Sequence, residues 1–403
     1  MLRDLLLQQF QQQFQQRLQG LPLRVQTWRG DILEGAGAKV HLALHTPKAL
    51  KVLASPTMGS LARAYVEGMI DLKGRAEDIL QFGQALCRVD ACRDAKGSEA
   101  WKWWRHTRLR DRKNIAYHYD VSNDFYSLWL DRNRVYSCAY FETPDDTLDS
   151  AQEKKLDLIC RKLMLRPGER LLDIGCGWGG LILRAAERYG AQAMGVTLSQ
   201  NQQDYVQEQI RRRGLQDKVE VRLMDYRDLP EAEGYDKIAS VGMFEHVGRR
   251  NLRAYFDKIA SLLKPGGLVM NHGITSVALS GGGLGSGISD FVEQYVFPGG
   301  ELVHASTVMQ EMAAAGIEPL DAENLRPHYG RTLWEWVDRL EMNEAEAIRM
   351  IGQKKYRIWR IYMAGSAFAF DRNWLALFQI LGGKPGPEGR QGYPFTRRHV
   401  YAA

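Results

Sequence analysis

The residues with the clearest chemical signature form a glycine-rich turn. From Asp173 to Gly180 the chain reads Asp-Ile-Gly-Cys-Gly-Trp-Gly-Gly, between an apolar run and a helical pattern. Glycine lets a backbone adopt positive φ and approach a ligand closely. An acid two residues before the first glycine would repel a pyrophosphate but can hold a cationic ligand. We therefore expect Asp173, Gly175 and Gly177 to bind S-adenosylmethionine rather than a nicotinamide cofactor. The alternative is a glycine turn without a ligand.

Three further candidates follow the next predicted strands. The second strand ends at Thr197 and lacks the acid that often binds ribose hydroxyls. The third is followed by Met-Asp-Tyr-Arg at 224–227, where a side chain can meet an adenine ring. The fourth is followed by Glu245, which we place at the mouth of the pocket because strand ends meet at one edge of an open sheet.

Apolar runs alternate with helical patterns in the middle of the chain. We predict strands at 170–174, 193–196, 219–224, 237–241 and 268–272, and helices at 150–164, 179–189, 200–213 and 251–263. This alternation is typical of βαβ units and a mostly parallel sheet. The expected fold class is α/β, a doubly wound Rossmann-like sheet of the class I methyltransferase kind. The last hundred residues are expected to be mainly helical.

A chain of 403 residues favours two domains. Residues 1–95 are expected to form a small α+β domain, with an amphipathic helix at 4–18, a strand at 39–44 and a helical stretch at 60–87. Residues 96–115 are predicted to be a basic, tryptophan-rich linker. Residues 116–403 are predicted to be the catalytic domain.

The predicted linker concentrates positive charge within a chain of net charge +6. Between residues 101 and 113, six basic side chains and three tryptophans accompany one acid. Basic residues attract anionic headgroups, and indoles prefer the boundary of a bilayer. A solvated linker and a base-stacking nucleic-acid segment are the alternatives. We expect an anionic phospholipid surface as partner, and no nucleic acid.

Cysteine usage and the N-terminus bear on the compartment. The five cysteines are odd in number and show no metal-ligand spacing, which favours a reduced compartment and predicts no metal. The first residues show no small-residue cleavage site, and no run of about 18 apolar residues occurs. We expect a cytoplasmic protein, peripherally associated with the inner face of the membrane.

Longer segments resemble the bacterial cyclopropane-fatty-acyl-phospholipid synthases and the related mycolic acid cyclopropane synthases. The most specific are Tyr-Ser-Cys-Ala-Tyr-Phe at 136–141 and Gly-Met-Phe-Glu-His-Val-Gly at 242–248. The similarity extends from about residue 117 to 370. A threonine at the end of the second strand, here Thr197, is also typical of that family. The resemblance implies methyl transfer to a cis double bond of a phospholipid acyl chain, and ring closure through a carbocation.

The resemblance also implies a base, a bicarbonate ion held by several side chains. The implied residues are Cys138, Glu245, His272, the backbone of Ile274, and Tyr329. A carboxylate, an imidazole, a phenol and a thiol can all hydrogen-bond a small oxyanion. We expect a protonated His272, or a shared proton, to offset Glu245. Cys138 is alternatively a buried small hydrophobic residue.

The same resemblance implies a set of cofactor-binding positions. These are Tyr136, Ser137, Gly175, Gly177, Thr197, Leu198, Gln202 and Tyr226. Asp173 fits the loop, as a ligand or as a brace.

Several alternatives remain open at the level of sequence. A sister lipid enzyme would give a methyl-branched or methylene chain, and a small-molecule N-methyltransferase would use the same core. A non-catalytic lipid-binding protein is a further hypothesis. The glycine-rich segment 280–290 is either a lid over the acyl site or a surface loop. The N-terminal domain is expected to bind lipid and to support a homodimer.

Overall fold

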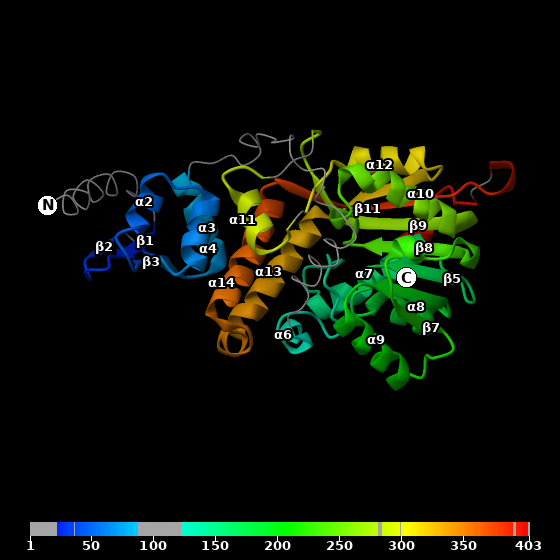
Figure 1. Cartoon of the computed structure of the whole chain (residues 1–403), viewed down its shortest axis with the longest axis horizontal. Helices are drawn as coiled ribbons and strands as arrows, with labels where there is room; N and C mark the ends of the chain where they lie inside the picture. The colour runs from blue at the N-terminus through cyan, green and yellow to red at the C-terminus, as the bar shows by residue number, and fades with distance from the viewer. Residues whose placement is uncertain are drawn as a thin grey trace. The chain divides into compact units, whose positions relative to one another are not determined.

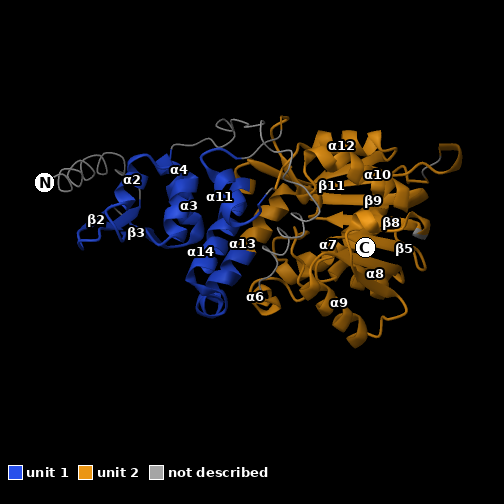
Figure 2. Ribbon diagram, viewed as in Figure 1, with its two compact units in different colours: residues 1–97, 283–298, 336–369 blue, residues 98–282, 299–335, 370–403 orange. Residues whose placement is uncertain are grey.

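The chain divides into two compact units. The computed structural model describes residues 22–35, 37–87, 122–280, 284–298, 300–389 and 392–401. Unit 1 comprises residues 1–97, 283–298 and 336–369, and unit 2 comprises residues 98–282, 299–335 and 370–403 (Figure 2). This grouping differs from the linear division predicted from sequence, because sequence patterns indicate elements and not the core that each element joins.

Some predictions lie outside the described residues. They are the amphipathic helix at 4–18 and the basic linker at 96–115. Lipid binding and dimerisation by the N-terminal domain therefore stay predictions. Among the helices that the structure describes, none is long and apolar enough to cross a membrane.

Unit 1 contains a four-stranded sheet with the order β2-β1-β3-β4. Its strands are β1 (Leu23–Gln26), β2 (Ile32–Glu34), β3 (Val40–Leu44) and β4 (Ile70–Lys73). Its shorter helices are α2 (Ala49–Ala54), α3 (Met58–Val66), α4 (Ala76–Cys87) and α11 (Ile288–Tyr295). The single helical stretch predicted at 60–87 is wrong, since β4 interrupts it. Gly68 and Gly74, both at positive φ, form the turns on either side of β4.

Unit 2 is built on a seven-stranded sheet with the order β10-β11-β9-β8-β5-β6-β7. The strands are β5 (Arg170–Ile174), β6 (Gln192–Thr197), β7 (Val219–Leu223), β8 (Tyr235–Val241), β9 (Leu263–Ser276), β10 (Glu318–Asn324) and β11 (Leu375–Gly383). The pairs from β7 to β9 are parallel, and β11 is antiparallel to both β9 and β10. The strand order reverses at β5, which pairs with β6 on one side and with β8 on the other.

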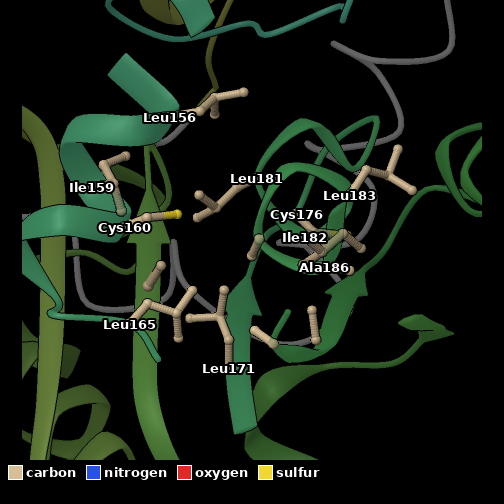
Figure 3. Close-up of a cluster of buried hydrophobic side chains, with 14 of the residues drawn as sticks. Leu156, Ile159, Cys160, Leu165, Leu171, Cys176, Leu181, Ile182, Leu183 and Ala186 are labelled. Carbon is tan, nitrogen blue, oxygen red and sulfur yellow. The ribbon is translucent and has the colours of Figure 1, made fainter. Parts of the chain in front are cut away.

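Helices cover both faces of this sheet (Figure 1). They are α7 (Leu148–Lys162), α8 (Gly180–Tyr189), α9 (Gln200–Arg212), α10 (Leu252–Leu262) and α12 (Ala305–Ala314). The same unit contains the short helices α6 (Asn123–Ser127) and α15 (Arg398–Tyr401). Neighbouring β5 residues enter opposite cores: Leu171 packs with α7, α8 and α9 (Figure 3), and Leu172 packs with α10 and α12. Since side chains alternate across a strand, this confirms a doubly wound sheet.

The predicted strands and helices between residues 150 and 272 match the observed elements closely, whereas the C-terminal region differs. The long helices α13 (Arg326–Met342) and α14 (Glu344–Asp371) are present, but β10 and β11 were not predicted. β10 lies at the sheet edge, is partly exposed and has no apolar alternation. Its strand conformation depends on pairing with β11, which a local pattern does not reveal.

Candidate active site

A pocket of about 290 Å³ opens at the carboxyl ends of β5, β6 and β8. This is the switch point of the strand order, where open α/β sheets bind ligands. All nine positions predicted for the cofactor line the pocket. They are Tyr136, Ser137, Asp173, Gly175, Gly177, Thr197, Leu198, Gln202 and Tyr226.

The glycine turn has the backbone that its sequence predicts. Gly175, Gly177 and Gly179 all have positive φ, of 82°, 54° and 81°. Gly175 donates its N–H to the carbonyl of Val196 at 3.0 Å, which ties the turn to β6. A Cβ on Gly175 would lie 3.1 Å from Cγ of Met243, so that position is tight as well as left-handed. The turn thus brings backbone to the pocket wall where a larger side chain would intrude.

Asp173 is the buried carboxylate of the pocket. It lies on the central strand β5 and is 3% exposed. Burial raises the pKa of this carboxyl to about 7, and the nearby Lys155 ammonium opposes the shift. Its Oδ1 accepts no hydrogen bond from any described residue. A buried acceptor of this kind fits a ligand that brings a donor or a positive charge.

Two residues of α7 that were not among the predicted site residues organise the pocket wall. Lys155 donates from Nζ to Oγ of Ser137 at 2.7 Å. Gln152 donates from Nε2 to the carbonyls of Val135 and Ser137 at 3.1 and 2.8 Å. Burial lowers the pKa of Lys155 to about 8. The spacing of three residues places Gln152 and Lys155 on one helical face, a signal present in the sequence.

Thr197 has a different role from the acid found at many such strand ends. Its hydroxyl donates to Oε1 of Gln202 at 2.7 Å and accepts the N–H of Ser199 at 3.2 Å. Because Oε1 of Gln202 accepts this bond, the amide nitrogen is the atom left to donate elsewhere. The threonine therefore orients a donor instead of supplying a carboxylate.

Glu245 and Ile274 are in contact at the point where β9 extends beyond the end of β8. β8 pairs with β9 only as far as Val241, opposite His272. Beyond that point the N–H of Ile274 donates to Oε1 of Glu245 at 2.7 Å. Burial raises the pKa of Glu245 to about 7, although this hydrogen bond opposes the shift. Oε2 of Glu245 is buried without a hydrogen-bond partner among the described residues.

His272 is almost wholly buried on β9, at 1% exposure. Burial holds the pKa of its imidazole well below the ordinary value, and Lys155 and Lys162 lower it further. Burial therefore favours the neutral ring over the protonated one. The alternative, a shared proton, agrees with the raised pKa of Glu245. The Nε2 atom of His272 has no partner within the described part of the chain.

Cys138 and Tyr329 meet at the carbonyl of Leu325. The thiol of Cys138 lies 3.8 Å from that oxygen, and the backbone N–H of Tyr329 donates to it at 3.1 Å. Burial raises the pKa of the Cys138 thiol, so the side chain is a weak donor and not a thiolate. The ring of Tyr329 packs on Phe370, with centroids 4.8 Å apart.

Backbone bonds at the ends of β9 and β11 connect the pair Glu245 and Ile274 with the pair Cys138 and Tyr329. Ile274 pairs with Leu377 on β11, and Leu325 donates its N–H to the carbonyl of Leu377 at 2.8 Å. Of the five predicted catalytic residues, His272 and Ile274 lie on β9, Glu245 bonds to Ile274, and Cys138 and Tyr329 are tied through Leu325 to β11. They do not line the cofactor pocket, but the N–H of Gly242, which does, bonds to the carbonyl of His272 at 2.8 Å. Within the described residues, no three His, Cys, Asp or Glu side chains form a metal-binding group.

Comparison with known proteins shows the family of this chain. Residues 106–380 match the model of the mycolic acid cyclopropane synthetase family. The chain belongs to that family. A probable fatty acid methyltransferase from Pseudomonas putida is 43% identical over 386 residues, which cover 94% of this chain and 96% of that protein.

Two comparisons with mycolic acid enzymes extend this finding. Cyclopropane mycolic acid synthase 1 from Mycobacterium tuberculosis is 36% identical over 275 residues, covering 66% of this chain and 95% of that protein. The crystal structure of mycolic acid cyclopropane synthase CmaA1, complexed with SAH and CTAB, superposes with a TM-score of 0.64 at 34% identity. It covers 68% of this chain and 98% of that one. The chain is thus a class I, S-adenosylmethionine-dependent methyltransferase of this family.

The glycine turn generates a direct test. Gly175→Ala adds a Cβ at positive φ against Met243, so we expect affinity for S-adenosylmethionine to fall about tenfold or more. Isothermal titration calorimetry measures the change. Gly168→Ala is the matched control, because Gly168 has a similar φ of 80° but nothing within 4 Å of its Cβ position. Equal affinity in Gly175→Ala and wild type would show that the turn does not contact the cofactor.

Proposed function

We propose that this enzyme transfers the methyl group of S-adenosylmethionine to the cis double bond of an unsaturated phospholipid acyl chain and closes a cyclopropane ring. The observation that carries the proposal is the buried set at the sheet edge. Glu245 and His272 each keep one buried polar atom without a partner among the described residues. Family membership and the similarity to a fatty acid methyltransferase support a lipid acceptor.

An alkene acceptor explains why the set contains no activated nucleophile. The π bond itself attacks the sulfonium methyl, the carbon–sulfur bond breaks with its electrons on sulfur, and a carbocation forms on the chain. Loss of a proton from the transferred methyl closes the ring. Aromatic faces stabilise a cation, and the rings of Tyr329 and Phe370 pack against each other at a tilt, with centroids 4.8 Å apart.

The polar set fits a bound bicarbonate, which supplies the base for that proton. Oε1 of Glu245 accepts the N–H of Ile274, so Oε2 is the atom that can accept the O–H of a bicarbonate. His272 and Cys138 contribute donors on the same edge. Ile274 acts here by orienting Glu245, because its N–H is already bonded to that carboxylate.

Product analysis tests the proposed reaction. Phospholipids of defined unsaturation, incubated with enzyme and S-adenosylmethionine, are expected to gain one CH₂ group by mass spectrometry. They are also expected to lose olefinic protons and to show high-field cyclopropane signals by NMR. A product that gains CH₂ but keeps olefinic signals would be the methylene or methyl-branched alternative. If an amine acceptor were methylated and no lipid gained mass, the proposed function would be wrong.

Glu245 should confer a pH dependence on turnover. Its raised pKa of about 7 means that the carboxylate, the form able to accept a hydrogen bond, is lost as pH falls through neutrality. At a fixed bicarbonate concentration, we expect kcat to fall roughly tenfold between about pH 8 and pH 6. His272 is already neutral throughout this range, so it adds no acidic limb. A flat profile would contradict the role of Glu245.

The Glu245→Gln variant tests the role of the Glu245 carboxylate directly. The N–H of Ile274 holds the amide oxygen, which leaves the NH₂ where an acceptor is needed. We expect turnover to fall by about a hundredfold or more while affinity for S-adenosylmethionine stays within about twofold of wild type. A parallel loss of cofactor affinity would instead place Glu245 in the cofactor site.

We further propose that the basic segment at 101–113 docks the enzyme on anionic membranes, peripherally and as a homodimer. Support comes from the six basic residues and three tryptophans of that segment.

In liposome sedimentation, binding should require anionic lipid and weaken at high salt. Arg108→Gln with Arg110→Gln should weaken it. Arg211→Gln with Arg212→Gln, both on the exposed side of α9, should not. Salt-insensitive binding would contradict the proposed docking on anionic membranes. A monomer in analytical ultracentrifugation would contradict the proposed homodimer.

A further inference from the structure

A buried polar row runs from His272 away from the active site. β11 lies between β9 and β10, and Gln379 pairs with His272 on one side and with Glu323 on the other. Lys162, the last residue of α7, reaches this row from the helix layer. His272, Gln379 and Lys162 are each 1% exposed. Polar side chains this deep need a partner for each donor and acceptor.

Lys162 determines which way the amide of Gln379 points. Its Nζ lies 2.7 Å from Oε1 of Gln379 and also donates to Glu323. An ammonium group donates and never accepts, so the amide oxygen must face Lys162. The amide nitrogen then faces Nδ1 of His272, at 3.1 Å. The opposite amide orientation would set an NH₂ group against an ammonium group.

The amide orientation in turn selects the tautomer of His272. An NH₂ group that faces Nδ1 can only donate to it, so Nδ1 accepts. A neutral imidazole carries a single proton, which must then lie on Nε2. Nε2 is the buried ring nitrogen without a partner among the described residues. His272 therefore presents an N–H donor, and not a lone pair, on the side away from Gln379.

We propose that Lys162 and Gln379 are positioning residues that lock His272 in the Nε2–H tautomer, so that it donates a hydrogen bond to the oxyanion of the reaction. The inference rests on the proposed function for the identity of that anion. In the other tautomer a lone pair would face the anion and repel it. Glu323 completes the row by pairing with Lys162, which keeps the ammonium charged inside the protein.

Gln379→Glu in the full-length chain tests the lock with little change of shape. A carboxylate cannot donate, so Nδ1 of His272 must become the donor, and in a ring that stays neutral the proton must leave Nε2. In ¹⁵N NMR of protein labelled at histidine, we expect the Nε2–H form in wild type and the Nδ1–H form in Gln379→Glu. A His272→Asn variant assigns the signal among the nine histidines. An Nδ1–H form in wild type, or an unchanged tautomer in the variant, would overturn the inference.

Kinetics test the link from the tautomer to the anion. Loss of one hydrogen bond to a charged group should raise the KM for bicarbonate about tenfold or more in Gln379→Glu. The KM for S-adenosylmethionine should stay unchanged, because none of these residues lines the cofactor pocket. A switched tautomer with an unchanged bicarbonate KM would overturn the coupling to the anion. A wild-type enzyme that methylates no lipid would contradict the proposed function and leave the NMR result standing by itself.

A second pair of variants separates the lock from the general loss of a buried lysine. Lys162→Met frees the amide of Gln379 to rotate, so we expect both tautomers of His272 and a raised bicarbonate KM. Lys237→Met is the matched control, since Lys237 is also buried, at 6% exposure, and lies 3.7 Å from Glu169. It stands on β8 at the opposite end from Val241. The control should keep the Nε2–H form; a mixture there as well would overturn the assignment to Lys162.

Discussion

The parallel pairing of β5 with β6 on one side and β8 on the other is the constraint on which the catalytic unit depends. Because the chain reverses direction in the strand order at β5, the loops that follow β5 and β8 separate and leave a pocket between them. The same pairing buries Asp173 within the sheet. An isolated buried carboxylate costs on the order of several kcal/mol, and Lys155 supplies the opposing charge that makes this burial tolerable.

The difference in length between β8 and β9 creates the candidate catalytic site around Glu245 and Ile274. β9 continues after β8 has ended, and the carboxylate of Glu245 takes the N–H of Ile274 that a longer β8 would have paired. Leu325, which follows β10, bonds to Leu377 on the antiparallel strand β11, and its own carbonyl meets Cys138 and Tyr329 near the same strand ends. The polar set therefore lies next to the cofactor pocket but is built by other strands. Under the proposed function, methyl donor and base would be held by separate parts of one sheet, which suits a reaction in which methyl transfer precedes proton loss.

Hydrogen bonds and an ion pair connect a row of polar side chains inside unit 2, from His272 through Gln379 to Lys162 and Glu323. Buried ion pairs seldom add stability beyond what well-packed apolar side chains would provide. Their presence in the core is therefore better explained by what they impose on a neighbour. Here the imposed property is the position of one proton on an imidazole that burial keeps neutral. In the proposed reaction, this N–H donor and the carboxyl of Glu245, whose pKa is raised to about 7, would hold the anion between them.

The sequence by itself determined the class of fold and the cofactor. Strand and helix periods between residues 150 and 272, together with Asp173 and the glycines that follow it, are local signals, because backbone conformation there depends on neighbouring residues. Tertiary structure alone decided the rest. It inserted β10 and β11 into the sheet, drew residues 283–298 and 336–369 into unit 1, and made His272 neutral. Lys162 and Gln379 stand 217 positions apart, so no local pattern connects them. Burial and pairing across strands set the charge of a side chain and the direction of its hydrogen bonds, and both depend on neighbours that are distant in the chain.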